Sequence, residues 1–455
     1  MSRDRLVVIG GDAGGMSAAS QARRRRDADE LEIIAIERGT HTSYSACGIP
    51  YWIAGDVDAA DDLVARAPAV FRDKYAIDVH LRHEATAIDL DRREVTARDL
   101  DGHGERTFGF DQLMIATGAV PVRPKLPGID RPGVYGVQTL DDGAAVQAAV
   151  RPDRTCAVVV GGGYIGLEMA EALVRRGLDV TLVEAADHLM STMDPDLADQ
   201  IADAVRNVGI TVRLGESVTG IEGADHVRAV TTDAGVIPAD LVVLGLGVRP
   251  NSALAKSAGI DCGPTGGIVT DRQQCTSHEG VWAAGDCVET FHRVSCRPVH
   301  IALGTHANKQ GRVAGINIGG GYATFPGVIG TAITKICNLE IARTGLSSRE
   351  CAAVGLSGVT ISVESTTRAG YFPGAELMTT KIIAERGTGR LLGAQIVGRE
   401  QSAKRIDVLA TALWNGMTVE EMVGMDLSYA PPFSPVWDPV LIAARKAADA
   451  VAAAR

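Results

Sequence analysis

Short apolar runs that end in a cluster of glycines recur along the chain, and the first begins near the N-terminus. Leu6–Ile9 is apolar, the glycine-rich segment 10–15 follows it, and a second apolar run, Leu31–Ile36, ends at Glu37. This order predicts strand, turn, helix, strand and acid, which is typical of dinucleotide binding because the helix N-terminus faces a pyrophosphate and the acid accepts ribose hydroxyls. Asp12 departs from the usual G-x-G-x-x-G pattern at its middle glycine. The candidate contacts are Gly10, Ala13, Gly14, Gly15 and Glu37.

The same pattern returns in the middle of the chain. Ala157–Val160 leads into the glycine-rich segment 161–166, a helix is expected to continue to about Arg176, and the strand Asp179–Val183 ends at Glu184. An acid at this strand end binds the ribose 2′-hydroxyl and repels a 2′-phosphate, so NADH is favoured over NADPH. The candidate contacts are Gly161, Gly163, Tyr164, Ile165, Gly166, Glu168 and Glu184.

Three further apolar runs end in turns or acids that suit a cofactor. Residues 113–115 lead into a small tight turn, Leu241–Gly247 is a comparable strand and turn, and the run that starts at Val281 ends at an acid placed to bind a ribityl hydroxyl. A helix over residues 301–317 is expected to aim its N-terminus at a flavin ring. Two dinucleotide units in one chain suggest one permanently bound and one exchanged dinucleotide. The candidate contacts are Ala116, Thr117, Gly118, Gly247 and Asp286.

The length and charge of the chain limit its class. A chain of 455 residues is too long for one hydrophobic core, so two or three domains are expected. A net charge of −11 argues against a nucleic-acid partner, and the four arginines at 23–26 form either a solvated helix face or an anion site. No apolar run reaches the length of a signal peptide or a membrane span, so a cytoplasmic protein without a membrane partner is expected.

The cysteines and histidines show no metal-ligand spacing. The eight cysteines lack a C-x-x-C pair and are scattered along the chain, so reduced thiols are expected. Taken alone, each is more typical of a small buried side chain than of a catalyst. The ten histidines form no H-x-x-x-H motif or Cys/His cluster, so no metal is predicted.

In these motifs and their order, the chain resembles the flavin-dependent pyridine nucleotide–disulfide oxidoreductases. The matching motifs are the two glycine turns, the Ala116-Thr117-Gly118 turn and Ala284-Gly285-Asp286, and the resemblance covers essentially the whole chain. It implies an α/β fold with two Rossmann-like dinucleotide-binding domains and an α+β C-terminal dimerisation domain. The implied FAD-binding domain comprises residues 1–120 and 250–325, the NAD(P)H-binding domain residues 121–249, and the dimerisation domain residues 326–455.

A single cysteine, Cys47, narrows the set of family members that the chain resembles. Members with an internal dithiol carry two cysteines separated by four residues, whereas threonine and tryptophan stand five positions either side of Cys47. The segment 43–51 is similar to that of single-cysteine members, which include coenzyme A–disulfide reductases, NADH oxidases, NADH peroxidases and persulfide or polysulfide reductases. Ala46 replaces the family's asparagine, and Ala13 replaces the histidine of the peroxidases, which counts against peroxidase chemistry.

The C-terminal segment 429–439 closely resembles the tail of coenzyme A–disulfide reductases, with Trp437 in place of a family lysine. In that group, two tyrosines of the partner subunit in a homodimer reach the active-site cysteine, and Tyr371 and Tyr429 match them. The resemblance therefore implies the catalytic set Cys47, Tyr371 and Tyr429. It also implies coenzyme A contacts at Gln21, Arg24, Ser43 and His306.

The implied cycle passes electrons from NADH through FAD to Cys47, which holds coenzyme A in a mixed disulfide or exists as a sulfenate. A nearby helix N-terminus is expected to lower the pKa of Cys47. Four alternatives stay open: an NADH oxidase that reduces oxygen through a Cys47 sulfenic acid, a persulfide reductase, a flavin reductase of a protein electron carrier that needs no cysteine, and a flavin-binding interaction protein without activity.

Overall fold

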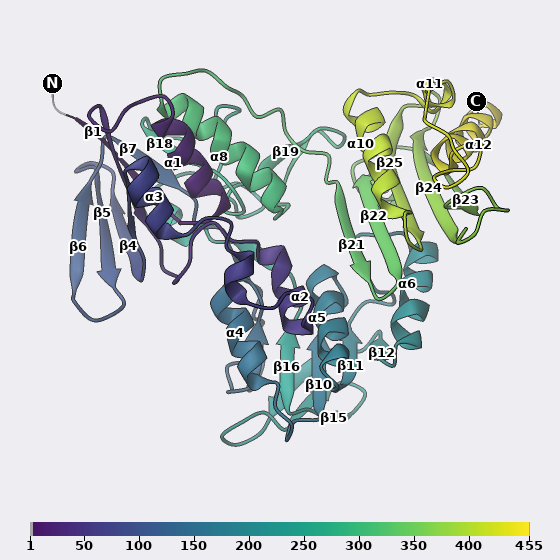
Figure 1. The fold of residues 1–455 in the computed structure, drawn as a ribbon, viewed down its shortest axis with the longest axis horizontal. Coiled ribbons are helices and arrows are strands. Elements are labelled where there is room, and N and C mark those ends of the chain that lie inside the picture. Colours follow the sequence, from purple (N-terminus) through teal and green to yellow (C-terminus); the bar gives the residue numbers. More distant parts are fainter. Residues whose placement is uncertain (1–2, 455) are drawn as a thin grey trace.

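The computed structural model describes residues 3–454, and its first part is built on a parallel sheet with the order β18-β7-β1-β2-β3 (Figure 1). One face of β1 packs on α1 and α8 through Leu6 and Val8. The other face packs on the antiparallel sheet β4-β5-β6. Burial on both faces explains the continuous apolar runs of the sequence. The elements are β1 (Asp4–Ile9), α1 (Ala13–Arg23), β2 (Leu31–Ile36), α3 (Pro68–Tyr75), β3 (Ile77–His80), β4 (His83–Asp89), β5 (Glu94–Asp99), β6 (Glu105–Gly109), β7 (Gln112–Ile115), β18 (Val281–Ala283) and α8 (Gly304–Ile318).

The second part repeats this arrangement. Its parallel sheet has the order β12-β11-β10-β16-β9, with the strand before the glycine turn at the centre, as β1 is in the first sheet. Val159 packs against helices, whereas Val158 and Val160 pack on the antiparallel sheet β13-β14-β15. The elements are β9 (Val134–Gly136), α4 (Leu140–Ala149), β10 (Cys156–Val160), α5 (Tyr164–Arg175), β11 (Asp179–Glu184), α6 (Pro195–Asn207), β12 (Thr211–Leu214), β13 (Val218–Glu222), β14 (Ala229–Thr232), β15 (Val236–Pro238) and β16 (Leu241–Leu244).

The C-terminal part is an antiparallel sheet with the order β21-β22-β25-β24-β23 (Figure 1). Ile382 and Ile396 of this sheet share a core with Leu409 of α10 and Val440 of α12. The predicted fold class, two parallel-sheet nucleotide units and a C-terminal α+β domain, is therefore confirmed. The elements are β21 (Ala332–Ile336), β22 (Leu339–Gly345), α9 (Ser348–Ala353), β23 (Gly358–Thr366), β24 (Leu377–Glu385), β25 (Leu391–Gly398), η3 (Ala403–Arg405), α10 (Ile406–Trp414), α11 (Val419–Val423) and α12 (Pro439–Ala453).

Two predicted elements differ in length from the observed ones. The strand expected over Leu241–Gly247 ends at Leu244, because a turn follows in which Gly247 adopts a positive φ of 81°. The helix expected from residue 301 begins at Gly304, after an extended Leu303. The remaining short elements are η1 (Ala46–Gly48), α2 (Ile49–Ala54), η2 (Ala60–Leu63), β8 (Ala119–Pro121), β17 (Val248–Pro250), α7 (Ala253–Ser257), β19 (Thr290–His292) and β20 (Arg297–Val299).

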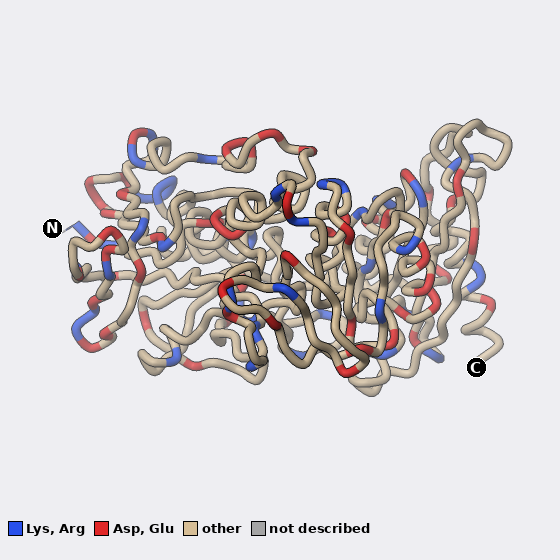
Figure 2. The backbone as a smooth tube through the Cα atoms, turned by 90° about the horizontal axis from the view of Figure 1, so that it is seen from below, with Lys and Arg blue, Asp and Glu red and all other residues tan. Residues whose placement is uncertain are grey.

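Charged residues of both signs are interspersed along the backbone (Figure 2). The chain carries 56 acidic and 45 basic residues in total, and the acidic excess lies in the two nucleotide-binding parts and not in the C-terminal part. Within residues 3–454, no helix combines the length and the apolar character that a membrane crossing requires.

Candidate functional site

One open cavity of about 2380 Å³ brings together most of the predicted site residues. It is larger than the roughly 300–1,000 Å³ that is typical of a site for one small molecule. Its wall joins both glycine turns, the segment that carries Cys47, and the first turn of α8. The predicted residues that border it are Gly10, Ala13, Gly14, Glu37, Ser43, Cys47, Ala116, Thr117, Gly118, Gly161, Gly163, Tyr164, Ile165, Glu168, Glu184, Gly247, Asp286 and His306.

Gly15 and Gly166 lie behind the cavity wall because they make the helix-to-strand contact. A Cβ atom at Gly15 would lie 1.9 Å from the carbonyl oxygen of Gly10, and one at Gly166 would lie 1.9 Å from that of Gly161. Any side chain would therefore push α1 or α5 away from its turn. These two glycines position the cofactor-binding turns without bordering the ligand space.

The two strand-end acids hold their glycine turns in the same way. Glu37 accepts the N–H groups of Gly11 and Gly39, each at 2.6 Å. Glu184 accepts the N–H of Gly162 at 2.6 Å and that of Ala186 at 2.8 Å. A carboxylate oxygen has two lone pairs, so each acid retains acceptor capacity for a ribose hydroxyl. The residues present therefore fit two adenosine-containing dinucleotides.

Asp12 occupies the position that Gly163 holds in the second unit. A Cβ atom at Gly163 would meet nothing within 4 Å, so this position has space for a side chain. Asp12 Oδ1 accepts the N–H of Tyr44 at 3.1 Å, and Ser43 donates its N–H to the carbonyl of Gly11 at 3.1 Å. The departure from the glycine pattern thus ties the segment that precedes Cys47 to the first glycine turn.

Cys47 lies in η1 and its side chain is exposed to the cavity. The expectation of a lowered thiol pKa is wrong for this chain. Desolvation is the largest cause of a raised pKa of Cys47, and the charges of Glu168 and Asp286 act in the same direction. A hydrogen bond of the Cys47 backbone lowers this pKa but does not outweigh these effects. The free thiol is therefore mainly protonated at neutral pH.

The four arginines at 23–26 divide into bound and free groups. Arg23 donates to the carbonyls of Tyr75 and Leu31, and Arg26 pairs with Asp4 at 2.8 Å. The side chains of Arg23 and Arg26 are therefore occupied by bonds at the edge of the first sheet. Arg24 is exposed at the C-cap of α1, and its side chain has no hydrogen-bond or ion-pair partner among the described residues.

Gln21 and Arg24 do not border the cavity of this single chain. The Gln21 Oε1 accepts a hydrogen bond from Arg25 at 3.0 Å, so its predicted ligand role would require that bond to be exchanged. His306 borders the cavity, but burial lowers its pKa to about 4. It is neutral at pH 7 and does not add positive charge for a phosphate.

Lys309 and Arg312 are cavity residues that the sequence analysis missed. Both are exposed, border the cavity from α8, and have no hydrogen-bond or ion-pair partner within residues 3–454. Their i, i+3 spacing places them on one face of a helix. That spacing was visible in the sequence, whereas the position of this face on the cavity was not.

Tyr371 and Tyr429 lie together on the C-terminal domain, away from the cavity. Their side chains are 78% and 46% exposed, and a hydrogen bond between them contributes to the raised pKa of Tyr429, for which desolvation is the largest cause. Their loops are joined where Ala369 donates its N–H to Pro431 at 3.1 Å. Exposed apolar residues of this kind are typical of an interface between proteins. Neighbouring exposed side chains are Leu377, Phe433, Val436 and Trp437.

Two dinucleotide-binding units share one cavity with an exposed thiol, an arrangement that suits an oxidoreductase. A family model described as pyridine nucleotide-disulphide oxidoreductase matches residues 4–311, and the model of the dimerisation domain of these proteins matches residues 331–439. The chain belongs to this family. It is therefore an oxidoreductase of the disulfide-reductase kind that uses FAD and NAD(P)H.

Three similar proteins illustrate the range of this family. The chain is 40% identical over 442 residues to an NAD(P)H sulfur oxidoreductase (CoA-dependent) of Pyrococcus abyssi, with 97% of each chain covered. It is 37% identical over 447 residues to an NADH oxidase of Methanocaldococcus jannaschii, with 97% of this chain and 98% of the relative covered. The solved structure of an NAD-dependent persulfide reductase from A. fulgidus is 39% identical, has a TM-score of 0.95, and is matched over 98% of this chain and 83% of that one.

Proposed function

We propose that the chain reduces coenzyme A disulfide, or a related low-molecular-weight disulfide or persulfide, with electrons from NADH. The observation that carries this proposal is the single exposed thiol of Cys47 on the wall that borders both glycine turns. Among the described residues, no other cysteine borders that cavity. A lone thiol cannot form an internal disulfide there, so the second sulfur of the redox pair must come from the substrate.

In the proposed cycle, the Cys47 thiolate attacks one sulfur of the disulfide R–S–S–R. A Cys47–S–S–R mixed disulfide forms, and one R–S⁻ leaves and takes a proton. Two electrons then cleave the mixed disulfide, which releases the second thiol and restores the Cys47 thiolate. FAD held at the first glycine turn would supply these electrons, and NADH held at the second would supply the hydride that reduces it. Tyr371 and Tyr429 of the partner subunit in a homodimer are our candidates for protonating the leaving thiolate.

Free cations around the cavity support a long, anionic substrate. Arg24 stands at the far end of α1, roughly 16 Å from its first residue at a rise of about 1.5 Å per residue. Lys309 and Arg312 lie nearer, on the cavity wall itself. Coenzyme A combines a reactive thiol with phosphates at the far end of a flexible arm, which suits a thiol site and distant cations.

Glu184 supports NADH as the reductant. Its carboxylate is held beside the second glycine turn by two backbone N–H groups, and the next residues are Ala185 and Ala186. A 2′-phosphate would meet this negative charge, and neither following residue offers a compensating cation.

The first test of the proposal identifies what is bound to Cys47. Mass measurement of the denatured, unreduced protein is expected to show coenzyme A on the peptide that contains Cys47. A sulfenic or sulfinic acid with no thiol adduct would overturn the coenzyme A proposal. That outcome would favour the second candidate, an NADH oxidase, which the name of the Methanocaldococcus jannaschii relative makes a specific alternative.

The second test removes the distant cation. Arg24→Ala is expected to raise the KM for coenzyme A disulfide by about tenfold, because a phosphate contact is worth roughly 1–2 kcal/mol, and to leave the KM for NADH unchanged. Arg176→Ala is the matched control, since Arg176 is the exposed C-cap of α5 at the equivalent place in the second unit. Equal KM values for Arg24→Ala and the wild type would remove Arg24 from the site.

A further inference from the structure

Residues 191–196, which connect the loop after β11 to α6, are bonded along their length to one row of side chains on the C-terminal sheet. Arg343 pairs in register with Gln395, Gln395 with Lys381, and Lys381 with Ser362. Side chains at paired positions of neighbouring strands point to the same face of a sheet. These four residues, here called the cross-strand row, belong to β22, β25, β24 and β23 in turn.

Each member of the row bonds to the next part of the segment, so that row and segment run side by side. Backbone groups are bound at the Arg343 end and carboxylates at the Ser362 end. The contacts are Arg343 Nη1 to Thr192 O at 2.6 Å, Asp194 N to Gln395 Oε1 at 2.8 Å, Lys381 Nζ to Asp194 Oδ2 at 2.9 Å and also to Asp196, and Ser362 Oγ to Asp196 Oδ2 at 3.1 Å.

This contact between two domains is both charged and buried. Arg343 and Lys381 are 7% and 6% exposed, and Asp194 is 2% exposed. Removing such groups from water is costly, and an apolar contact of similar volume would hold two domains together as well or better. The directional bonds add defined positions for two backbone atoms of the segment, Thr192 O and Asp194 N.

The positioned segment reaches the cavity beside the second glycine turn. Ser191 borders the cavity, and the neighbouring Met190 donates its N–H to the carbonyl of Gly162 in the second glycine turn at 2.8 Å. The hydroxyls of Thr192 and Tyr164 are both buried, and neither forms a hydrogen bond of normal geometry among the described residues, although the Thr192 hydroxyl lowers the pKa of Tyr164. Tyr164 itself borders the cavity at the start of α5.

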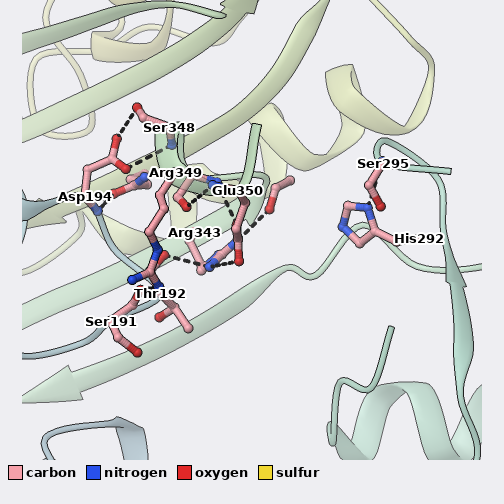
Figure 3. A network of polar contacts seen from close by, with 12 residues as sticks. Ser191, Thr192, Asp194, His292, Ser295, Arg343, Ser348, Arg349 and Glu350 are labelled. Atoms are coloured by element: carbon pink, nitrogen blue, oxygen red, sulfur yellow. Dashed lines mark hydrogen bonds and ion pairs between the residues drawn. The ribbon is translucent and has the colours of Figure 1, made fainter. Parts of the chain in front are cut away.

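Of the four row residues, Arg343 is the one that bonds to Thr192, the residue next to Ser191 on the cavity wall. Figure 3 shows its guanidinium between Glu350, with which it pairs at 2.6 Å, and the carbonyl of Thr192. Burial raises the pKa of Tyr164, and the positive charge of Arg343 and the Thr192 hydroxyl oppose that rise. Arg343 is thereby connected to the surroundings of Tyr164 by its bond to the Thr192 carbonyl and by its positive charge.

We propose that the cross-strand row, and Arg343 above all, positions Tyr164 and the second glycine turn for hydride transfer from the nicotinamide, so that the C-terminal domain controls the reductive half of the reaction. Arg343 is a positioning residue in this proposal, since it does not border the cavity. The proposal rests on reduction of the enzyme by NADH and not on the identity of the final oxidant.

The test is stopped-flow measurement of flavin reduction by NADH in the FAD-loaded enzyme, without any disulfide. Arg343→Met keeps an apolar stem and removes the bonds to Thr192 and Glu350. We expect the rate constant at saturating NADH to fall at least tenfold, and Arg343→Lys to restore much of it because its amine can still donate to Thr192 O. Reoxidation of the reduced enzyme by ferricyanide is expected to stay within twofold of the wild type.

Two further sets of variants distinguish a loss of positioning by the row from a general loss of stability. Arg390→Met removes an arginine that pairs with Glu385 on the same sheet without touching residues 191–196, and it is expected to leave flavin reduction unchanged. Thr192→Val and Tyr164→Phe, alone and combined with each other, leave the sheet intact. If the row acts through these hydroxyls, the two effects on flavin reduction are non-additive.

The proposal is overturned if Arg343→Met slows reduction and reoxidation equally, if it leaves both unchanged, or if the Thr192 and Tyr164 effects simply add. Should Arg343→Met not fold, the Thr192→Val and Tyr164→Phe pair still decides the question. A wild-type enzyme that NADH reduces but coenzyme A disulfide does not reoxidise would refute the proposed substrate and leave this inference standing.

Discussion

Replacing Asp12 with asparagine removes a carboxyl that is buried at the first glycine turn. Burial is the largest cause of a raised pKa, the bond from Tyr44 opposes it, and Glu37 and Asp286 add to it, so that the pKa of Asp12 rises from 3.8 to about 6. The amide oxygen of asparagine can still accept the N–H of Tyr44. Asp12→Asn therefore removes the charge and retains the bond.

The two pKa values determine the expected magnitude. One pKa unit corresponds to about 1.4 kcal/mol, so an ionised Asp12 destabilises the fold by at most about 3 kcal/mol when the pH is above both values. Between these values the folded chain binds more protons than the unfolded chain, so the free energy of unfolding falls as the pH rises through this range. Asp12 is partly exposed, and we expect Asp12→Asn to stabilise the flavin-free protein by about 1–3 kcal/mol at pH 8.

Urea unfolding of the flavin-free protein, followed by circular dichroism at pH 8 and pH 5, measures this effect. At pH 5 the folded carboxyl is mostly protonated, so the gain from Asp12→Asn is expected to shrink to about half. Asp58→Asn is the control, because it removes an equal charge from an exposed position. No stabilisation at pH 8, or an equal gain at both pH values, would refute the assignment of a buried, charged Asp12.

Three further substitutions test other parts of the site. Cys47→Ser is expected to abolish disulfide reduction and to leave NADH-dependent dye reduction within about twofold, and retained turnover of the natural oxidant would favour a flavin reductase of a protein carrier. Glu184→Ala is expected to raise kcat/KM for NADPH relative to NADH by about tenfold or more, because the acid that repels the 2′-phosphate is gone, and an unchanged ratio would contradict that role. Gly166→Ala is expected to destabilise the second unit by about 1–3 kcal/mol through the clash with Gly161 O, whereas Gly163→Ala, where a Cβ atom meets nothing within 4 Å, should unfold like the wild type in the absence of ligand.

The local sequence was sufficient to predict both nucleotide-binding units. Burial of parallel strands on both faces produces uninterrupted apolar runs such as Leu6–Ile9, and the close contact at Gly15 and Gly166 excludes any side chain. These constraints act between residues that are near one another in the chain. They are therefore visible as spacing, and the structure reproduces the predicted strands to within a few residues.

The environment of each site residue was decided by contacts between distant segments. Desolvation is the largest cause of the raised pKa of Cys47, and the charges of Glu168 and Asp286, which lie far along the chain, add to it, so the expected lowering became a rise. Among the arginines at 23–26, the folded chain shows that Arg23 and Arg26 are already bound, because Arg23 donates to the carbonyl of Tyr75 and Arg26 pairs with Asp4.

The chain alone therefore determined that two dinucleotide-binding units are present, because glycine turns and their acids are formed by residues that are close in the sequence. Only the tertiary structure decided that they share one cavity, that Lys309 and Arg312 face it, and that a row of side chains on the C-terminal sheet bonds to residues 191–196 beside the second glycine turn. Electrostatic and hydrogen-bonding effects depend on distance in space, and the order of residues in the sequence does not specify that distance.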